Sequence, residues 1–210
     1  IAISSDRGLA GAYNSNILKS LAKELQQDRD QGVKSEVIVV GKQAARFITR
    51  FNDIEVSAVY RDFPENPTPN DIRPILKSIT EKYKSKDIDL ADILYTDFKS
   101  SIRQEVKYQR LLPAAYTEVP IDDQLELAEF EPSPKAVLDN VTTRLIEAQL
   151  SQAFLESQAS EHSMRMMAMK NANDNATDLV DDLTLEFNTA RQAAITQELA
   201  EITGGAEAIK

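Results

Sequence analysis

Residues 135–203 read KAVLDNVTTRLIEAQLSQAFLESQASEHSMRMMAMKNANDNATDLVDDLTLEFNTARQAAITQELAEIT, a stretch with neither proline nor glycine. Because those two residues are the strongest helix breakers, the stretch predicts one continuous helix. At about 1.5 Å per residue this helix would run roughly 100 Å, several times the width of a small domain. We therefore expect most of it to project from the globular part of the protein as a shaft.

Apolar residues recur along this helix at alternating steps of three and four. This 3.5-residue repeat is typical of a helix that winds around a partner in a left-handed coiled coil. No helical pattern of comparable length precedes it, so we expect the partner to come from another chain or from a part of the native protein outside these residues. Gln152, His162 and Asn173 interrupt the apolar row. We call the whole row the seam: Leu138, Val141, Leu145, Ala148, Gln152, Leu155, Ala159, His162, Met166, Met169, Asn173, Ala176, Val180, Leu183, Phe187, Ala190 and Ala194.

Composition limits the remaining possibilities. The chain has 210 residues, of which 42% are hydrophobic, and this suits one α/β domain plus an appendage. No apolar run approaches the roughly 20 residues that cross a bilayer, and we expect no membrane insertion. The start at Ile1, without Met, suggests a fragment. The absence of cysteine excludes disulfides, thiolate metal sites and cysteine nucleophiles, and fits a reducing compartment.

Charge is distributed unevenly along the chain. Residues 1–117 carry 18 Lys and Arg against 16 Asp and Glu, whereas residues 118–210 carry 6 against 18. An acidic helix would be repelled by nucleic-acid phosphates and by anionic lipid. The distribution therefore favours protein partners.

The first 113 residues alternate between β-rich runs and helical patterns, which predicts an α/β fold with a mostly parallel five-stranded sheet and flanking helices. Three helices are expected, through Ile17–Leu25, through Ala44–Ile48 and through Ile75–Tyr83, the last with Asn70 or Asp71 as its N-cap. We predict a globular foot over 1–113, an irregular connector over 114–134, and the long helix over 135–210. The expected strands are Ile1–Ser4, Val37–Val40, Glu55–Phe63, Asp92–Phe98 and Gln104–Leu112.

A turn with Gly8 and Gly11 follows the first expected strand and precedes a helix, an arrangement that can bind phosphate. The residues match neither G-x-G-x-x-G nor the Walker A pattern, and no Lys-Ser/Thr follows. Glycines are needed more often for a tight turn than for a phosphate cradle, so the turn is the favoured interpretation.

Other candidate sites also have ordinary explanations. His162 lies on the seam without an acid, a serine or a metal-ligand spacing beside it, and interface packing is the favoured interpretation. The four methionines cluster in the middle of the helix, which favours packing over an adaptable sliding surface; they are Met164, Met166, Met167 and Met169. Four acidic residues fit a solvated outer stripe of the helix better than a cation site. They are Asp178, Asp181, Asp182 and Glu186. We therefore expect no catalytic residues, no metal and no cofactor.

Two segments resemble a known family. Residues 3–14, ISSDRGLAGAYN, resemble the SDRGLxGxYN signature of the γ subunit of F-type ATP synthases. Residues 169–176, MKNANDNA, together with residues 188–202, NTARQAAITQELAEI, resemble the C-terminal signature of that family, and Phe130-Glu131-Pro132 fits it as well. The resemblance extends over essentially the whole chain.

The resemblance implies a Rossmann-like domain without nucleotide beside an asymmetric antiparallel coiled coil. The seam's partner would then be the family's own N-terminal helix, which precedes the first strand. The chain lacks cysteine and lacks a long acidic insertion before Tyr116, which favours a bacterial form over a light-regulated plastid form.

The resemblance also implies a function as the rotor shaft. The coiled coil would turn inside a ring of three α and three β subunits, while the foot binds the ε subunit and the membrane c-ring, at the cytoplasmic face of a bacterial membrane. The residues that match partner-binding positions of the family are Arg191 and Gln192 against a β loop, Arg165 and Gln197 facing the stator, and Phe130 and Glu131 near the c-ring. Arg191 is one of three Lys or Arg residues between Arg144 and Ala208, which suits a specific bond to a carboxylate.

Two other functions remain open at this point. One is a nucleotide-binding α/β enzyme that dimerises through the long helix, and saturable ATP or NAD binding at the Gly8–Gly11 turn would favour it. The other is a passive coiled-coil scaffold, which homodimerisation of the helix without affinity for α and β subunits would favour.

Overall fold

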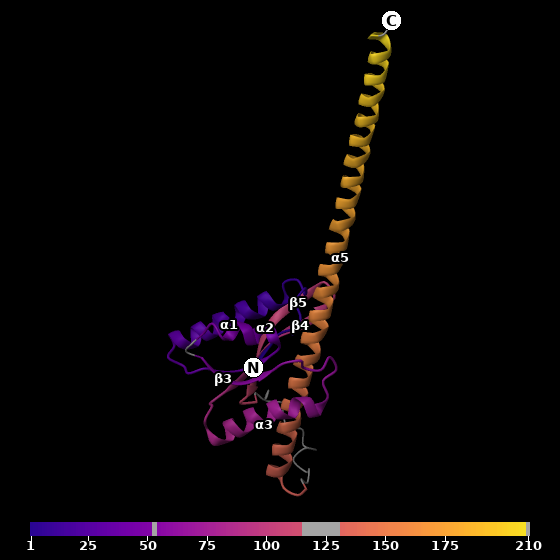
Figure 1. Ribbon diagram of the computed structural model, residues 1–210. Helices are drawn as coiled ribbons and strands as arrows, with labels where there is room; N and C mark the ends of the chain where they lie inside the picture. Colours follow the sequence, from indigo (N-terminus) through magenta and orange to yellow (C-terminus); the bar gives the residue numbers. More distant parts are fainter. Residues whose placement is uncertain (52–53, 115–130, 209–210) are drawn as a thin grey trace. The chain divides into compact units, whose positions relative to one another are not determined.

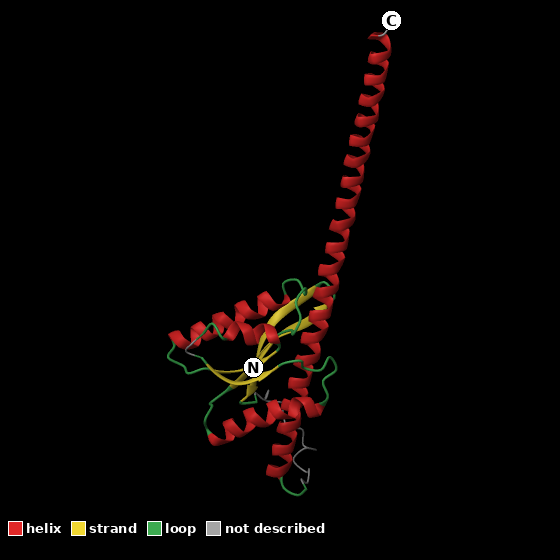
Figure 2. Cartoon of the chain, in the orientation of Figure 1, coloured by secondary structure: helices red, strands yellow, loops and turns green. Residues whose placement is uncertain are grey.

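The computed structural model describes residues 1–51, 54–114 and 131–208. The chain divides into two compact units, Ile1–Met166 and Met167–Lys210. One helix, α5 (Pro134–Ala208), contributes residues to both units and is drawn without interruption in Figure 2. The predicted continuous helix is thus present, and it extends past Thr203 through Gly204 and Gly205. Among the described residues, no helix is both long and apolar enough to span a bilayer.

The first unit contains a five-stranded sheet in the order β3-β2-β1-β4-β5. Figure 1 labels β3, β4 and β5 of this sheet. Neighbouring strands are parallel except at the β4–β5 hairpin, which is antiparallel. The predicted mostly parallel α/β sheet is therefore confirmed, with its antiparallel pair at one edge. The strands are β1 (Ala2–Ile3), β2 (Glu36–Val40), β3 (Glu55–Tyr60), β4 (Ala91–Ser100) and β5 (Arg103–Leu112).

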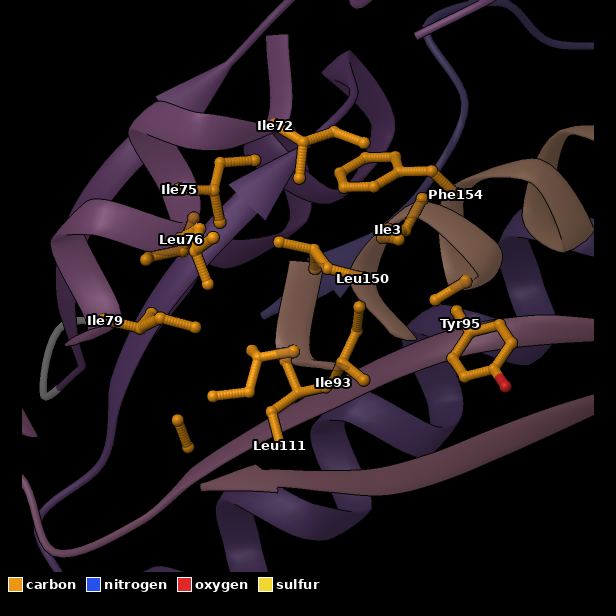
Figure 3. Close-up of a cluster of buried hydrophobic side chains, with 14 of the residues drawn as sticks. Ile3, Ile72, Ile75, Leu76, Ile79, Ile93, Tyr95, Leu111, Leu150 and Phe154 are labelled. Atoms are coloured by element: carbon orange, nitrogen blue, oxygen red, sulfur yellow. The ribbon is translucent and has the colours of Figure 1, made fainter. Parts of the chain in front are cut away.

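Helices cover both faces of this sheet because its inner strands are apolar on both sides. Val37 and Val39 of β2 pack with α1 (Tyr13–Asp30) and α2 (Lys42–Ile48). Ile38 and Val40 point to the other face, where they pack with α3 (Pro69–Ser85) and the first half of α5. Figure 3 shows this second cluster, in which Leu150 and Phe154 of α5 lie among residues of α3 and the strands: Ile3, Ile72, Ile75, Leu76, Ile79, Ile93 and Leu111.

Two expectations about element ends were wrong. The N-cap of α3 is Thr68, not Asn70 or Asp71. The Thr68 hydroxyl and backbone N–H both donate to the Asp71 carboxylate, at 2.6 and 2.8 Å, and this capping box together with Pro69 fixes the start of the helix. The third strand ends at Tyr60 and not at Phe63, whose ring instead stacks on Phe154 with centroids 4.6 Å apart.

The predicted division at residues 113 and 135 stays a prediction, and most of the predicted connector lies outside the described residues. The compact units divide the chain elsewhere, between Met166 and Met167. The reason is that Ile146, Leu150, Ala153 and Phe154 of α5 are buried in the core of the first unit. About half of the long helix by sequence is therefore part of the globular unit.

Candidate functional site

The loop after β1 closes the N-terminus of α2. Helix N-termini bind phosphate through backbone N–H groups that have no partner within the helix. Here the first three of these groups already have partners: Lys42 N–H donates to Asp6 Oδ1 at 3.0 Å, Gln43 N–H to the Ser5 carbonyl at 3.1 Å, and Ala44 N–H to Ser4 Oγ at 2.9 Å. The residues of the signature segment therefore cap a helix from within the chain.

The glycines near this loop have different roles. Gly11 has φ of 53°, a left-handed conformation that a tight turn requires and that glycine adopts most easily. Gly8 has nothing within 4 Å of an added Cβ, so no close approach explains it. Gly41 is the constrained one: its φ is 94°, and a Cβ there would lie 2.2 Å from the Ser4 carbonyl oxygen. The φ angle supports the turn interpretation for Gly11. At Gly41 the structure shows a tight packing contact that sequence reasoning missed.

Open α/β sheets bind ligands at the carboxyl ends of the strands where the chain switches direction across the sheet. In this sheet that point lies between β1 and β4, and α5 occupies it. Ser157 Oγ shares a hydrogen bond of 2.6 Å with the Tyr13 hydroxyl, and Ser160 Oγ donates to the Thr96 carbonyl at 3.2 Å. Both serines are fully buried.

The space left at this point is small. A cavity of about 40 Å³ remains, with Ser4, Asp6, Phe63 and Phe154 among its lining residues. Ligand pockets usually measure about 300–1,000 Å³, so a nucleotide does not fit. The β1–β4 switch point thus gives no support to the nucleotide-binding enzyme.

The described part of the chain contains no group of three His, Cys, Asp or Glu that could hold a metal ion. His162 is exposed, and so are the four acids of the predicted outer stripe: Asp178, Asp181, Asp182 and Glu186. Burial raises the pKa of the Tyr13 phenol well above its usual range, so its hydroxyl keeps its proton and its hydrogen bond at neutral pH.

The part of α5 in the first unit has two apolar faces. One face carries Ile146, Leu150 and Phe154 and is buried against the sheet. The other carries the seam and is exposed: Leu138 and Val141 retain 56% and 55% of their accessible surface. A helix whose second apolar stripe remains in water is suited to a further helical partner.

In the second unit, the described residues from Met169 to Gly205 are all exposed. The seam residues Val180, Leu183 and Phe187 are among them. Sequence reasoning missed a further group of exposed apolar side chains outside the seam: Leu185, Ile195, Leu199 and Ile202. Their signal was available, because Ile195, Leu199 and Ile202 recur at steps of four and three in a register offset from the seam and therefore lie on another face of the helix. The end of α5 thus presents apolar groups on more than one side.

Three of the predicted partner-binding residues lie close together in sequence on this exposed helix. Arg191 is exposed and, among the described residues, has no hydrogen bond or ion pair. The amide nitrogen of Gln197 donates to Glu201 Oε1 at 3.0 Å, and the Gln192 carbonyl accepts from Thr196 Oγ1 at 2.9 Å. The Arg191 guanidinium is the group with unused donors.

The other three predicted residues lie in or next to the first unit. Arg165 forms an ion pair with Glu161, with 2.5 Å between Nη2 and Oε1, and its side chain is only 24% exposed. Its guanidinium thus already has a carboxylate partner within the helix. Glu131 is exposed just before Pro132, and Phe130 lies outside the described residues.

Comparison with known proteins identifies the family. Residues 1–209 match the family model described as ATP synthase. The chain is 40% identical over its whole length to the ATP synthase gamma chain of Staphylococcus carnosus, and covers 73% of that protein. The chain belongs to the family of ATP synthase gamma chains. The gamma chain of Psychrobacter arcticus is likewise 40% identical, with the same coverage.

Solved structures show the same fold at lower sequence identity. The Euglena gracilis mitochondrial ATP synthase contains a chain with a TM-score of 0.65 and 22% identity, matching 99% of this chain and 71% of that one. A chain from the central stalk and c-ring of the Tetrahymena thermophila mitochondrial ATP synthase has a TM-score of 0.58 and 24% identity, matching 81% and 74%. The Rossmann-like domain and long helix of this chain are thus the fold of the gamma family, and its relatives include bacterial gamma chains.

Proposed function

We propose that this chain is the central rotor subunit of a bacterial F-type ATP synthase. It turns inside a ring of three α and three β subunits, and its foot, residues 1–113, binds the ε subunit and the c-ring. The observation that supports this most strongly is the exposed seam of α5, which runs through both units and is uncovered from Leu138 to Ala194 apart from the half-buried Ala159. We propose the α, β, ε and c-ring partners because the chain belongs to the gamma family.

A second helix of the same subunit covers this seam in our proposal. The gamma relatives extend beyond the part that this chain matches, since the match covers 73% of each. An antiparallel helix from that further part would bury Leu138, Val141 and Leu183, whose exposure is otherwise unfavourable. The apolar residues on the other faces, such as Leu185 and Leu199, would then face the stator ring.

The subunit's role in the reaction is mechanical. An asymmetric shaft makes different contacts with each of three β subunits, and a contact that differs between conformations shifts their populations. Rotation driven by the c-ring would therefore change nucleotide affinity at sites that this chain does not form. The small cavity at the β1–β4 switch point, about 40 Å³, supports a non-catalytic role. The subunit would act at the cytoplasmic face of the membrane as a peripheral part of the complex.

Arg191 provides the test. We propose that its guanidinium bonds a β-subunit loop at certain rotor angles, together with Gln192, while Gln197 and Arg165 face the stator and Phe130 and Glu131 face the c-ring. A hydrogen bond to a charged group contributes about 1.5–3 kcal/mol. Since about 1.4 kcal/mol corresponds to a factor of ten in rate, Arg191→Ala should lower ATP turnover of the assembled αβγ complex by roughly tenfold or more.

The control must be a cation without a structural role in the chain. Arg144 is unsuitable because its guanidinium bonds Glu147 at 3.1 Å. Lys170 is exposed on the same helix and has no ion pair among the described residues, so Lys170→Ala is the matched control. Equal turnover in the Arg191→Ala and Lys170→Ala complexes would show that Arg191 is an ordinary solvated charge. Failure of the wild-type protein to assemble with α and β subunits would refute the rotor function itself.

A further inference from the structure

Four polar side chains on two turns of α5 bond four different parts of the globular unit. Ser157 bonds the Tyr13 hydroxyl of α1, and Gln158 Nε2 donates to the Pro64 carbonyl at 2.7 Å, in the segment between β3 and α3. Ser160 donates to the Thr96 carbonyl of β4. Ser163 Oγ donates at 2.7 Å to the Ser101 carbonyl, in the turn between β4 and β5. These bonds tie one helical segment to parts that are far apart in the sequence.

The three serines differ from other hydroxyl residues of the same helix. Ser151 and Thr143 bond the backbone carbonyls four residues earlier, Glu147 and Asp139, and so make no tie to another element. Further along, four threonines do the same: Thr177, Thr184, Thr189 and Thr196. Bonding within the helix is thus the common pattern on α5, and Ser157, Ser160 and Ser163 depart from it.

Packing alone does not require these hydroxyls. Alanine would let the helix approach the sheet as closely as serine does, and a buried hydroxyl is unfavourable unless it is hydrogen-bonded. Ser157 and Ser160 have no accessible surface, and Ser163 has 8%. The hydroxyls make the contact between α5 and the globular unit directional. A hydrogen bond weakens steeply with distance and angle, whereas apolar contacts tolerate sliding.

The geometry points to a mechanical role. A side chain about 5 Å from the helix axis moves by about 1.7 Å when the helix turns by about 20° around its own axis. That displacement would carry donors now 2.6–3.2 Å from their acceptors beyond hydrogen-bonding distance. The three bonds therefore resist twisting of α5 against the sheet. They lie within the last ten residues of the first unit, directly before the boundary at Met166.

We infer that Ser157, Ser160 and Ser163, with Tyr13 and the carbonyls of Thr96 and Ser101, form a torque joint that locks the shaft helix to the foot. This inference rests on the proposed rotor function. The serines act here as positioning residues: they touch no nucleotide, and they transmit twist between the part of the subunit that the c-ring turns and the helix that acts on β.

The test uses the full-length subunit in an immobilised αβγ complex. A bead is attached to the foot through Gln31→Cys, at an exposed position, and these 210 residues contain no native cysteine. The triple variant Ser157→Ala/Ser160→Ala/Ser163→Ala should show a loss of torsional stiffness, seen as a broader angular distribution of the bead at its resting positions. Amide hydrogen exchange over residues 157–163 should become at least about tenfold faster, the factor that corresponds to 1.4 kcal/mol. Ser151→Ala, which removes a hydroxyl bonded within the helix, should match the wild type in both measurements.

The outcomes separate the joint from the rotor function. A triple variant that keeps the angular distribution and exchange rates of the wild type would overturn the joint. A wild-type complex that binds α and β but does not rotate would refute the rotor function, while the exchange comparison would still test the contacts. If the triple variant fails to fold, Ser163→Ala and Ser163→Thr replace it. Loss of stiffness with alanine and recovery with threonine, which keeps a hydroxyl, would support the joint, and equal behaviour of the two would overturn it.

Discussion

Gly41→Ala should strongly destabilise the globular unit, because the new methyl group has no room. A Cβ at Gly41 would lie 2.2 Å from the Ser4 carbonyl oxygen and 2.6 Å from Ser4 Oγ. Both neighbours are held in place: Ser4 N–H donates to the Val40 carbonyl at 2.8 Å, and Ser4 Oγ accepts from Ala44 N–H. Relief of the clash must therefore displace Ser4 and break the cap on α2.

The expected decrease in the free energy of unfolding is the sum of two contributions. The backbone of Gly41, with φ of 94° and ψ of 147°, lies in a region that is essentially restricted to glycine, and strain there costs about 1–3 kcal/mol. Two displaced hydrogen bonds add about 0.5–1.5 kcal/mol each. We expect a loss of about 2–6 kcal/mol, a large fraction of the roughly 5–15 kcal/mol that stabilises a typical protein.

Two other glycines serve as controls for the two sources. Gly32 has φ of 72° but nothing within 4 Å of an added Cβ, so Gly32→Ala should cost only the backbone term of about 1–2 kcal/mol. Gly8 has neither constraint, and Gly8→Ala should change stability by at most about 0.5 kcal/mol. Urea denaturation of the full-length protein measures all three, and the Gly41→Ala midpoint should fall by about 1–2 M. A Gly41→Ala loss no larger than that of Gly32→Ala would refute the packing argument.

Phe154→Ala should cost about 3–5 kcal/mol in the same assay, because the ring is fully buried and stacked on Phe63, whereas Ile102→Ala at an 81% exposed position should cost little. Lys99, 2.6 Å from Asp97, holds the pKa of that carboxyl below its usual range. Because the carboxyl has a lower pKa in the folded state, its ionisation stabilises the protein at pH values above its unfolded-state pKa of about 3.9. This stabilisation is lost as the pH falls through the folded-state pKa. Below about pH 4, the urea midpoint should therefore fall less steeply with pH in Asp97→Asn than in the wild type. Leu183→Asp, on the seam, should impair association of the two shaft helices, measured by circular dichroism and hydrogen exchange. Leu185→Asp, off the seam, should leave the subunit folded but weaken its assembly with α and β. Identical effects of the two substitutions would contradict the assignment of the two faces.

Local patterns were sufficient to predict most of the elements. The run Val37–Val40 is apolar on both faces, and the structure buries it between two helical layers. The proline- and glycine-free stretch correctly predicted α5. The Thr68 cap was also predictable, because Thr-x-x-Asp with a proline after the threonine is a capping-box pattern, although Asn70 and Asp71 lie closer to the apolar run.

Contacts between distant residues could not be predicted in this way. The cap on α2 joins Ser4, Ser5 and Asp6 to residues 36 to 40 positions later, and no local pattern encodes that pairing. The burial of Ile146, Leu150 and Phe154 had a local signal, since they recur every four residues. That signal was overlooked because the seam accounted for the helix with a single apolar stripe. The first half of α5 carries two apolar stripes. The buried stripe of Ile146, Leu150 and Phe154, not the seam, determines how far the globular unit extends along the helix.

The same segment of α5 fills the switch point of the sheet and carries the function that we propose. In an open α/β sheet the crevice beyond β1 and β4 is the place for a ligand, and access to it requires that nothing of the chain fills it. Here Phe154, Ser157 and Ser160 fill it, leaving about 40 Å³. Because the segment is continuous with the rest of α5, these contacts would carry a turning force from the foot to the shaft in the proposed rotor. In the proposed rotor, mutations that reopen the crevice would therefore loosen the connection to the shaft before they created room for a nucleotide.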